Sequence, residues 1–366
     1  MISATNKMLA KFQRYIQLTG PMSLAEYMSM CLFDSEFGYY STNIPIGVDG
    51  DFTTSPEISQ IFGELIALWI LETWELQGKP DNVHIIELGP GRGTLMRDMI
   101  RTMRIRPEFM KTSHFHCLEA SPVLCEAQHE LLAQFNVPVT WHKNFETVPT
   151  GNNYIIANEF FDVLPIRHFV HYKTNWHERM IGLTDKGELT FVLGSTPILI
   201  DENHDSFPMP KEGDIREISP ASDAWMQEIA ERVRGDGAAL IIDYGYEKPR
   251  LGETFQALCN QAYISPLQNP GNSDLTAHVD FGNLGQVSSK AGAAPQPLLT
   301  QAEFLIKMGL LERAGQLGAD KDKAFQLTLH QAVNRLAGSE EMGALFKVFA
   351  VAPKHQSFSP FVETGP

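Results

Sequence analysis

The stretch that decides the fold is His84-Ile-Ile-Glu-Leu-Gly-Pro-Gly-Arg-Gly-Thr-Leu95, an apolar run that leads into closely spaced glycines and then into a helical pattern. Gly89, Gly91 and Gly93 let the backbone turn tightly and approach a ligand with no Cβ in the way. The first N–H groups of the following helix, from Thr94 and Leu95 onward, then face that ligand. The stretch therefore predicts a strand, a ligand-binding loop and a helix.

The rest of the chain repeats this alternation of strand and helix patterns. Ser121-Pro122, Ser219-Pro220 and the capping box Thr300-Gln-Ala-Glu303 each predict a helix start, and Ser55-Pro56-Glu57 predicts one helix that runs to Gly78. Because most of the strand patterns are continuous apolar runs, we expect a doubly wound, Rossmann-like α/β sheet of mostly parallel strands. The expected strands are Val83–Leu88, His114–Glu119, Val137–Trp141, Tyr154–Asn158, Ala238–Asp243 and Phe346–Ala352.

Three segments do not follow this alternation. Residues 1–80 are mostly helical in pattern, with a glycine-punctuated loop from Gly38 to Asp51, and residues 166–217 resemble antiparallel hairpins with a turn at Asp185-Lys186-Gly187. Residues 265–297 are rich in Pro, Gly, Ser and Asn and predict a long loop. We expect a helical lobe at 1–80, a sheet domain at 81–165 and 218–366, and a β insertion at 166–217.

Composition narrows the function classes. The 29 basic and 44 acidic residues give a net charge of −15, which argues against binding to a nucleic-acid backbone. The acidity would suit a basic substrate such as an arginine-rich protein segment, although plain solubility is the simpler explanation. We expect no membrane insertion, because no apolar run reaches the ~20 residues that a membrane span needs.

The cysteines and the N-terminus bear on metals and location. The four cysteines are scattered with no CxxC pair, so we expect reduced thiols and no metal site. Met1 to Gly20 contain no apolar signal core, which makes the cytoplasm the expected location.

The spacing of the glycines and two acids points to one cofactor. GxGxG with Glu87 two residues before the first glycine is tighter than the dinucleotide pattern GxGxxG. This tighter form is typical of enzymes that use S-adenosylmethionine, whose cofactor carries a charged amino-acid tail and no phosphate. Glu119, at the end of the second strand, can accept hydrogen bonds from both ribose hydroxyls, or it is simply a surface glutamate. Asn144 and Phe145, after the third strand, would border the adenine.

The fourth strand supplies the candidate catalytic groups. Asn158, Glu159 and Asp162 follow it, and carboxyl ends of parallel strands form the ligand crevice, so we expect these side chains where the methyl group sits. An arginine nucleophile has too high a pKa to lose its proton beforehand, so Glu159 and Asp162 would grip its guanidinium in a bidentate manner. His278 would assist proton transfer or shape the arginine channel, unless it is only structural.

One further segment lies before a helix start. Thr53, Thr54 and Ser55 precede a helix N-terminus that could face the cofactor carboxylate, and helix capping alone explains them equally well.

Several longer stretches carry a family resemblance. The sequence resembles the MidA-like family, which includes mitochondrial complex I assembly-factor arginine methyltransferases and bacterial relatives. The resemblance implies a seven-stranded methyltransferase sheet with an N-terminal helical lobe, and an arginine in a complex I (NADH dehydrogenase) subunit as the protein substrate. The stretches are Phe37–Tyr40, Gly50–Glu57, Phe62–Glu64, Glu87–Thr94, Asn158–Pro165, Ile241–Gly245 and Asp274–Phe281.

Two other functions stay open at this point. A nicotinamide-dependent oxidoreductase would use a similar strand–loop–helix unit but needs the third glycine one residue later. A non-catalytic complex I assembly chaperone would keep the fold and the cofactor site without turnover. The sequence leaves a homodimer possible and does not decide between one and two added methyl groups.

Overall fold

The structure is a computed structural model that describes residues 4–42, 53–199 and 208–362. These residues form two compact units. The hairpin unit contains residues 4–42, 162–199, 208–224 and 246–282, and the sheet unit contains residues 53–161, 225–245 and 283–362. The sequence predicts domains that are divided at residues 80, 165 and 217. These domains are not the same as the two compact units, and the division stays a prediction.

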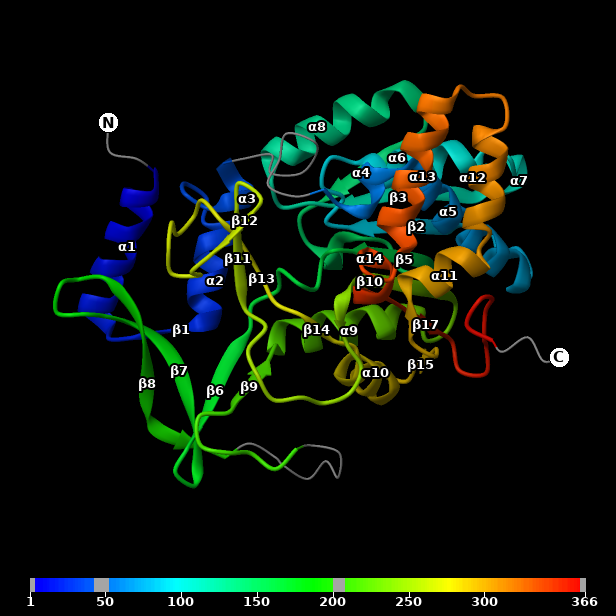
Figure 1. Cartoon of the computed structure of the whole chain (residues 1–366). Coiled ribbons are helices and arrows are strands. Elements are labelled where there is room, and N and C mark those ends of the chain that lie inside the picture. Colours follow the sequence, from blue (N-terminus) through cyan, green and yellow to red (C-terminus); the bar gives the residue numbers. More distant parts are fainter. Residues whose placement is uncertain (1–3, 43–52, 200–207, 363–366) are drawn as a thin grey trace. The chain divides into compact units, whose positions relative to one another are not determined.

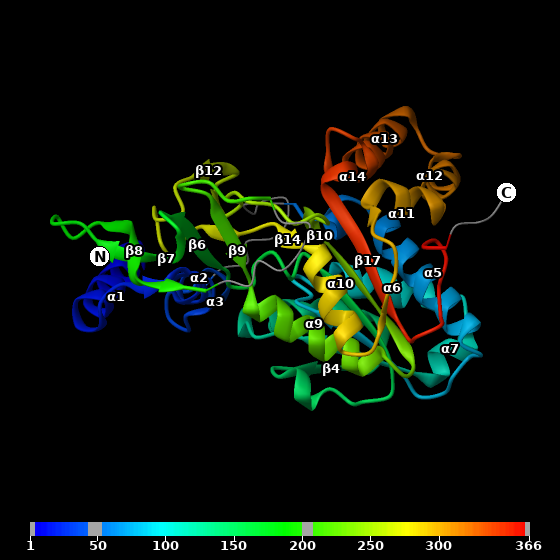
Figure 2. The same ribbon diagram turned by 90° about the horizontal axis from the view of Figure 1, so that it is seen from below.

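The sheet unit is built on a mixed sheet in which seven strands follow one another in the order β15-β17-β10-β5-β2-β3-β4, with β16 paired to β17 off this path. Neighbours from β10 to β4 pair in parallel, and β17 pairs antiparallel with β10, beside which it runs in Figure 2. The predicted α/β sheet is therefore confirmed. Its strands are β2 (Val83–Leu88), β3 (Ser113–Leu118), β4 (Val139–His142), β5 (Asn152–Asn158), β10 (Gly237–Tyr246), β15 (Ala294–Pro295), β16 (Leu299–Thr300, beside β17) and β17 (Phe346–Ala352).

Strand order reverses next to β2. The chain builds β2, β3 and β4 outward in one direction, and β5 then returns to the other side of β2. In open α/β sheets the ligand crevice lies at the carboxyl ends of the strands at such a switch point. The residues at the ends of β2, β3 and β5 therefore border the expected ligand crevice.

Helices cover both faces of this sheet, and α9 and α10 lie on the opposite side from α5 and α6 (Figure 1). Trp69, Ile70 and Met99 belong to the buried cluster on the α5 and α6 side. The helices are α4 (Ser55–Ile58), α5 (Gln60–Leu76), α6 (Thr94–Met103), α7 (Pro107–Thr112), α8 (Pro122–Leu132), α9 (Pro220–Val233), α10 (Phe281–Lys290), α11 (Gln301–Lys307), α12 (Leu310–Gly318), α13 (Lys323–Ala337) and α14 (Met342–Leu345), with short 3₁₀ turns η1 (Ala133–Phe135) and η2 (Phe145–Thr147).

The hairpin unit consists of N-terminal helices and antiparallel strands. Helix α1 (Ala4–Thr19) buries Met8, Phe12 and Ile16 at helical spacing. The larger sheet has the order β1-β7-β6-β9 with β8 paired to β7, which confirms the predicted hairpins. The remaining elements are β1 (Met22–Ser23), α2 (Leu24–Phe33), α3 (Tyr39–Thr42), β6 (Arg167–Tyr172), β7 (Asn175–Leu183), β8 (Leu189–Ile198), β9 (Ile215–Ile218), β11 (Gln256–Cys259), β12 (Ala262–Ile264), β13 (Asp274–Thr276) and β14 (Val279–Asp280).

Two local predictions were wrong. The single helix expected from Ser55 to Gly78 is interrupted at Ser59, whose backbone is extended and whose side chain accepts a hydrogen bond from Ile61 N to begin α5. The long loop expected at 265–297 contains helix α10, in which Phe281, Leu284 and Ser288 are buried at helical spacing. Its glycines hid that pattern.

Some of the predicted residues lie outside the described part of the chain. Of the loop expected from Gly38 to Asp51, residues 43–51 lie outside the described residues, as do Gly50–Phe52 of the family stretch. Within the part of the chain that the structure describes, every helix is too short or too polar to cross a membrane.

Candidate functional site

The glycine loop connects the end of β2 to the start of α6. Gly89, Gly91 and Gly93 have φ values of 63°, 56° and 85°, a left-handed region that side chains with a Cβ rarely adopt. Gly93 is the residue that caps α6, so the free N–H groups of that helix begin immediately after the loop. Thr94 and Leu95 are buried at its first turn, where Thr94 Oγ1 donates a hydrogen bond to Glu57.

Glu87 lies in β2 just before this loop, and its side chain is buried. It accepts a hydrogen bond from the backbone N–H of Met96 in α6. Burial raises the pKa of Glu87 well above its ordinary value, and the nearby charge of Glu119 adds to the rise. The strand thus ends in a carboxyl group that lies against the start of a helix.

Glu119 follows β3 and is also buried. Its Oε1 accepts the backbone N–H of Ser121 at 2.8 Å, and its Oε2 accepts Nε2 of Gln128 at 3.1 Å. Burial raises the pKa of Glu119, whereas these two hydrogen bonds oppose the rise. Glu119 is therefore a held carboxylate, unlike the solvated surface glutamate that the sequence left open.

The loop after β4 contains Asn144 and Phe145. Asn144 is exposed, whereas Phe145 is buried beneath the Arg232 guanidinium, which lies 4.1 Å from its ring centroid. Phe145 also packs 5.4 Å from the ring of Trp225. The backbone of this loop is fixed by Arg232 Nη2, which donates to Phe145 O at 2.7 Å.

A chain of hydrogen-bonded histidines, which sequence reasoning missed, also reaches this loop. We define the histidine ladder as His84 in β2, His116 in β3 and His142 in β4. His84 Nδ1 lies 3.0 Å from His116 Nε2, and His116 Nδ1 lies 3.0 Å from His142 Nε2. At the β4 end of the ladder, His142 Nδ1 lies 2.9 Å from Thr147 Oγ1 in η2. The parallel register moves each histidine two residues further along the next strand, a spacing that was visible in the sequence once the strands were aligned.

The end of β5 supplies a third acidic residue, which is half-buried. Glu159 has a left-handed backbone with φ of 51°, and its N–H donates to Ile242 O at 2.8 Å. Its Oε1 accepts two hydrogen bonds, from Ser55 N at 3.2 Å and from Asn158 Nδ2 at 3.1 Å. The N–H of Ser55, at the first residue of α4, is therefore directed at a carboxylate of the protein itself.

The two residues before Ser55 differ in exposure. Thr53 is exposed and Thr54 is buried as the residue that precedes α4. Thr54 makes no side-chain capping bond, and Ser55 Oγ donates to Gln301 Oε1 at 3.2 Å instead.

Asp162 and His278 belong to the hairpin unit, where the structure brings their segments together. The carbonyl oxygen of Asp162, a buried residue, accepts the N–H of Ala277 at 2.9 Å. The N–H of His278 donates to Thr254 Oγ1 at 2.9 Å, and that hydroxyl in turn donates to Glu217. Glu217 also accepts from His168 at 2.8 Å, so a buried network fixes the backbone next to His278.

We define the carboxyl-end rim as Glu87, Glu119 and Glu159, the acids at the ends of β2, β3 and β5. Within the described residues, Glu87 Oε2 and the Oδ1 of Asn158, which precedes Glu159 in the chain, are buried and have no hydrogen-bond partner. A buried acceptor without a partner costs about 1–3 kcal/mol, so both atoms fit a molecule that donates hydrogen bonds. S-adenosylmethionine has such donors in its ammonium group and its ribose hydroxyls.

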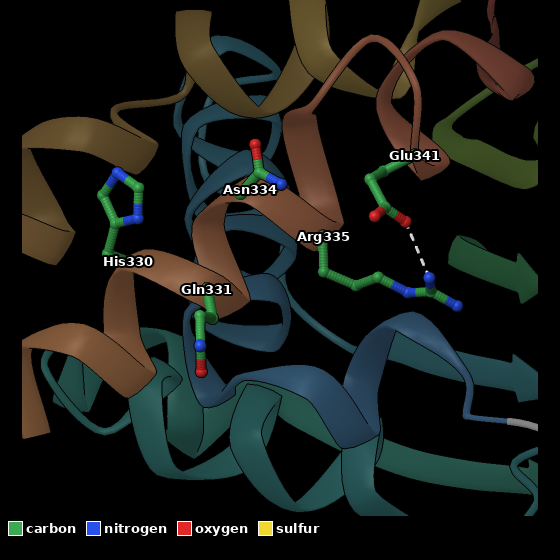
Figure 3. Close-up of a pocket in the computed structure, with 5 residues that line it drawn as sticks. All are labelled: His330, Gln331, Asn334, Arg335 and Glu341. Atoms are coloured by element: carbon green, nitrogen blue, oxygen red, sulfur yellow. Dashed lines mark hydrogen bonds and ion pairs between the residues drawn. The ribbon is translucent and has the colours of Figure 1, made fainter. Parts of the chain in front are cut away.

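A hollow on the surface of the sheet unit is an alternative to the rim as a binding site. A surface hollow of about 350 Å³ lies along α13 and is lined by His330, Gln331, Asn334, Arg335 and Glu341 (Figure 3). Arg335 and Glu341 are ion-paired across it at 2.6 Å, and none of the predicted site residues lines it. Among the described residues, no cluster of three or more His, Cys, Asp or Glu side chains could hold a metal ion.

The chain is similar to known proteins over most of its length, including the glycine loop. Residues 65–298 match the family described as "Putative S-adenosyl-L-methionine-dependent methyltransferase". The protein arginine methyltransferase NDUFAF7 of mitochondria is 34% identical in Xenopus tropicalis over 380 residues, covering 96% of this chain and 87% of that protein. The human protein of that name is 33% identical and covers 95% and 84%.

A solved structure agrees at the level of the fold. A Burkholderia thailandensis protein bound to S-adenosyl-homocysteine superimposes with a TM-score of 0.84 over 98% of this chain and 94% of that chain, at 24% identity. The family match decides against the nicotinamide alternative, because it spans the glycine loop and specifies another cofactor. The chain belongs to this family of S-adenosylmethionine-dependent methyltransferases, with the MidA-like and NDUFAF7 proteins as relatives.

Proposed function

We propose that this protein is a protein arginine N-methyltransferase and that its substrate is an arginine in a subunit of respiratory complex I (NADH dehydrogenase). The relatives at 33–34% identity are named protein arginine methyltransferases, which supports the acceptor type. The family resemblance supports complex I as the target. The net charge of −15 suits a basic segment of a protein substrate.

The cofactor roles that we propose follow the geometry of the carboxyl-end rim. Glu87 would accept the ammonium group, Glu119 the ribose hydroxyls, and Asn144 with Phe145 would border the adenine. The loop backbone at Gly89, Gly91 and Gly93, with Thr94 and Leu95, would approach the amino-acid tail, as would Thr53, Thr54 and Ser55. When bound, the cofactor supplies a methyl group activated by a sulfonium.

The acceptor roles follow from the chemistry of arginine. A guanidinium stays protonated at neutral pH, so the protein must hold the cation and receive a proton as the new bond to carbon forms. Glu159 is prepared for this because Ser55 N–H and the Asn158 amide converge on one of its oxygens and set the plane of the carboxylate. We propose that Glu159 aligns the guanidinium with Asp162 and that one of them or His278 receives the proton.

The observation that carries the proposal is this grip on Glu159, and methyl transfer tests it. The purified protein is incubated with tritium-labelled S-adenosylmethionine and membranes from cells that lack the protein, and the labelled protein is fragmented and its amino acids identified. We expect labelled methylarginine in a complex I subunit. Label on another residue type would contradict the arginine assignment, and label on an unrelated protein would contradict the substrate.

A single substitution separates catalysis from binding. Glu159→Gln keeps the size of the side chain but cannot receive the proton, so we expect turnover to fall by about 10²–10⁴-fold while cofactor affinity stays within a factor of three. Normal turnover would remove Glu159 from the mechanism. Wild-type protein that binds cofactor but labels no protein would instead favour the assembly chaperone.

Location and assembly are proposed separately. We propose the cytoplasm as the location, which the free thiols of the four cysteines fit, and fractionation of cells that express the tagged protein tests it. A homodimer is the oligomeric state to test by sedimentation.

A further inference from the structure

Gln128 connects three parts of the cofactor site. Its side chain lies on α8 and is fully buried although it is polar. Its Nε2 donates to Gly91 O at 2.7 Å and to Glu119 Oε2 at 3.1 Å, and its Oε1 accepts the indole N–H of Trp141 at 2.9 Å. One side chain therefore joins the glycine loop, the acid after β3 and strand β4.

These partners allow one orientation of the amide and one type of side chain. A carbonyl oxygen and a carboxylate only accept hydrogen bonds and an indole N–H only donates, so the amide nitrogen must face Gly91 and Glu119. A glutamate at position 128 would set a second carboxylate against Glu119. Methionine would satisfy none of the three partners, and asparagine is one methylene shorter.

The amide also controls how Glu119 presents its lone pairs. Ser121 N–H holds one carboxylate oxygen and Gln128 holds the other, which fixes the carboxylate plane. The backbone N–H of Ala120 also donates to this carboxylate, and the remaining lone-pair capacity of its two oxygens is available to a ligand. These hydrogen bonds favour the ionised form of Glu119, the form in which both oxygens accept.

We propose that Gln128 is a positioning residue that makes the site specific for a ribonucleoside. Gln128 holds Glu119 so that its carboxylate faces a vicinal diol. It also fixes the backbone of the glycine loop through its hydrogen bond to Gly91 O. Such a site prefers a ribose to a deoxyribose, because a deoxyribose leaves one buried carboxylate lone pair without a donor. This inference rests on the cofactor site proposed above.

Binding of two ligands tests it. S-adenosylhomocysteine and its 2′-deoxyribose analogue are titrated calorimetrically into the full-length protein. We expect wild type to prefer the ribose ligand by about tenfold or more, and Gln128→Met to reduce this preference to about twofold, mainly by weakening the ribose ligand. Gln134→Met, at an exposed glutamine in η1, is the matched control and should keep both affinities.

Three results would overturn the proposal or the site beneath it. If Gln128→Met keeps the full ribose preference, or weakens both ligands equally, Gln128 only fills space. Glu119→Gln distinguishes failure of the Gln128 inference from failure of the proposed cofactor site. If that variant keeps the preference, Glu119 is not the ribose acid and the cofactor site is wrong as well; if it loses the preference while Gln128→Met keeps it, only the inference fails.

A second variant covers the case in which Gln128→Met does not fold. Gln128→Glu keeps the shape, and its carboxyl group can donate a hydrogen bond only when protonated. Affinity of this variant for S-adenosylhomocysteine should therefore rise as the pH falls from 8 to 5, a dependence that wild type, with its neutral amide, should not show. Affinity of this variant that follows the wild-type slope would contradict the positioning role.

Discussion

The carboxyl-end rim and the histidine ladder share strands β2 and β3, and two of the three titratable groups in each are buried. Burial raises the pKa of Glu87 and Glu119 and lowers the pKa of His84 and His142, and that of His116 to about 4, so all of these groups are pushed toward their neutral forms. Their hydrogen bonds differ. The ladder satisfies its own donors and acceptors, whereas Glu87 has a buried oxygen with no partner within the described residues.

The ends of the ladder define its protonation. Thr147 Oγ1 donates to Asn144 O at 2.7 Å, so it accepts from His142 Nδ1–H. Each histidine must then carry its proton on Nδ1 and accept on Nε2, down to His84, whose Nε2 faces the Asn82 amide at 3.4 Å. An added proton on any member turns an acceptor into a donor and breaks a bond. The ladder is therefore structural, whereas the rim contains a buried acceptor without a partner, which we propose that a ligand completes.

The largest effect should come from the loop at the rim. Gly91→Val places a branched side chain at φ of 56°, so we expect cofactor affinity to fall by roughly 100-fold or more in calorimetry. Gly78→Val, at φ of 83° with open space around it, introduces similar strain at the end of α5. It should lower stability and spare affinity. Unchanged affinity of Gly91→Val would refute the loop.

The next effect should come from the middle of the ladder. His116→Leu leaves a donor of His84 and an acceptor of His142 unpaired in the interior, so we expect the free energy of unfolding to fall by about 2–4 kcal/mol in urea titrations. Cofactor affinity should stay within a factor of three. His330→Leu, at an exposed histidine on α13, should cost under ~0.5 kcal/mol. A large loss of affinity without loss of stability would place the ladder in the binding site.

The pH dependence should be smaller and has a defined sign. An unfolded histidine has a pKa of about 6.5, whereas the pKa of folded His116 is lowered to about 4 by burial and by His84, His142 and His114. His142 also faces Arg232. The unfolded state thus binds more protons between these values, so stability is present above pH ~6.5 and is lost as the pH falls toward 4. Between pH 7 and 5 we expect a loss of roughly 1–2 kcal/mol that His116→Leu reduces, and an equal slope in both proteins would contradict the ladder.

The smallest effect should come from the open end of the ladder. Asn82→Gly removes one long contact at 3.4 Å from an exposed side chain and suits the left-handed backbone there (φ of 55°), so we expect a stability loss below ~0.5 kcal/mol in the same urea titrations. A loss as large as that of His116→Leu would mean that the ends, and not the buried middle, hold the strands together.

The same contrast explains what the sequence could predict. Val83–Leu88 and Phe346–Ala352 were predicted with the observed bounds because each is an apolar run flanked by polar residues or turns. Glu87, Glu119 and Glu159 could be predicted to lie at one edge because the carboxyl ends of parallel strands share that edge of the sheet. Gln128 was not found, since its partners Gly91, Glu119 and Trp141 are neighbours only after three strands have been aligned. The break at Ser59 likewise depends on local capping that no periodicity reveals.

A crystal structure of the protein with S-adenosylhomocysteine is the most direct test of the central claim, that the rim binds the cofactor. We predict density for the ligand between the glycine loop and Glu119, with its ammonium group at Glu87 and its ribose at Glu119. Density in the hollow beside His330 and Arg335, with the rim unchanged, would contradict the account.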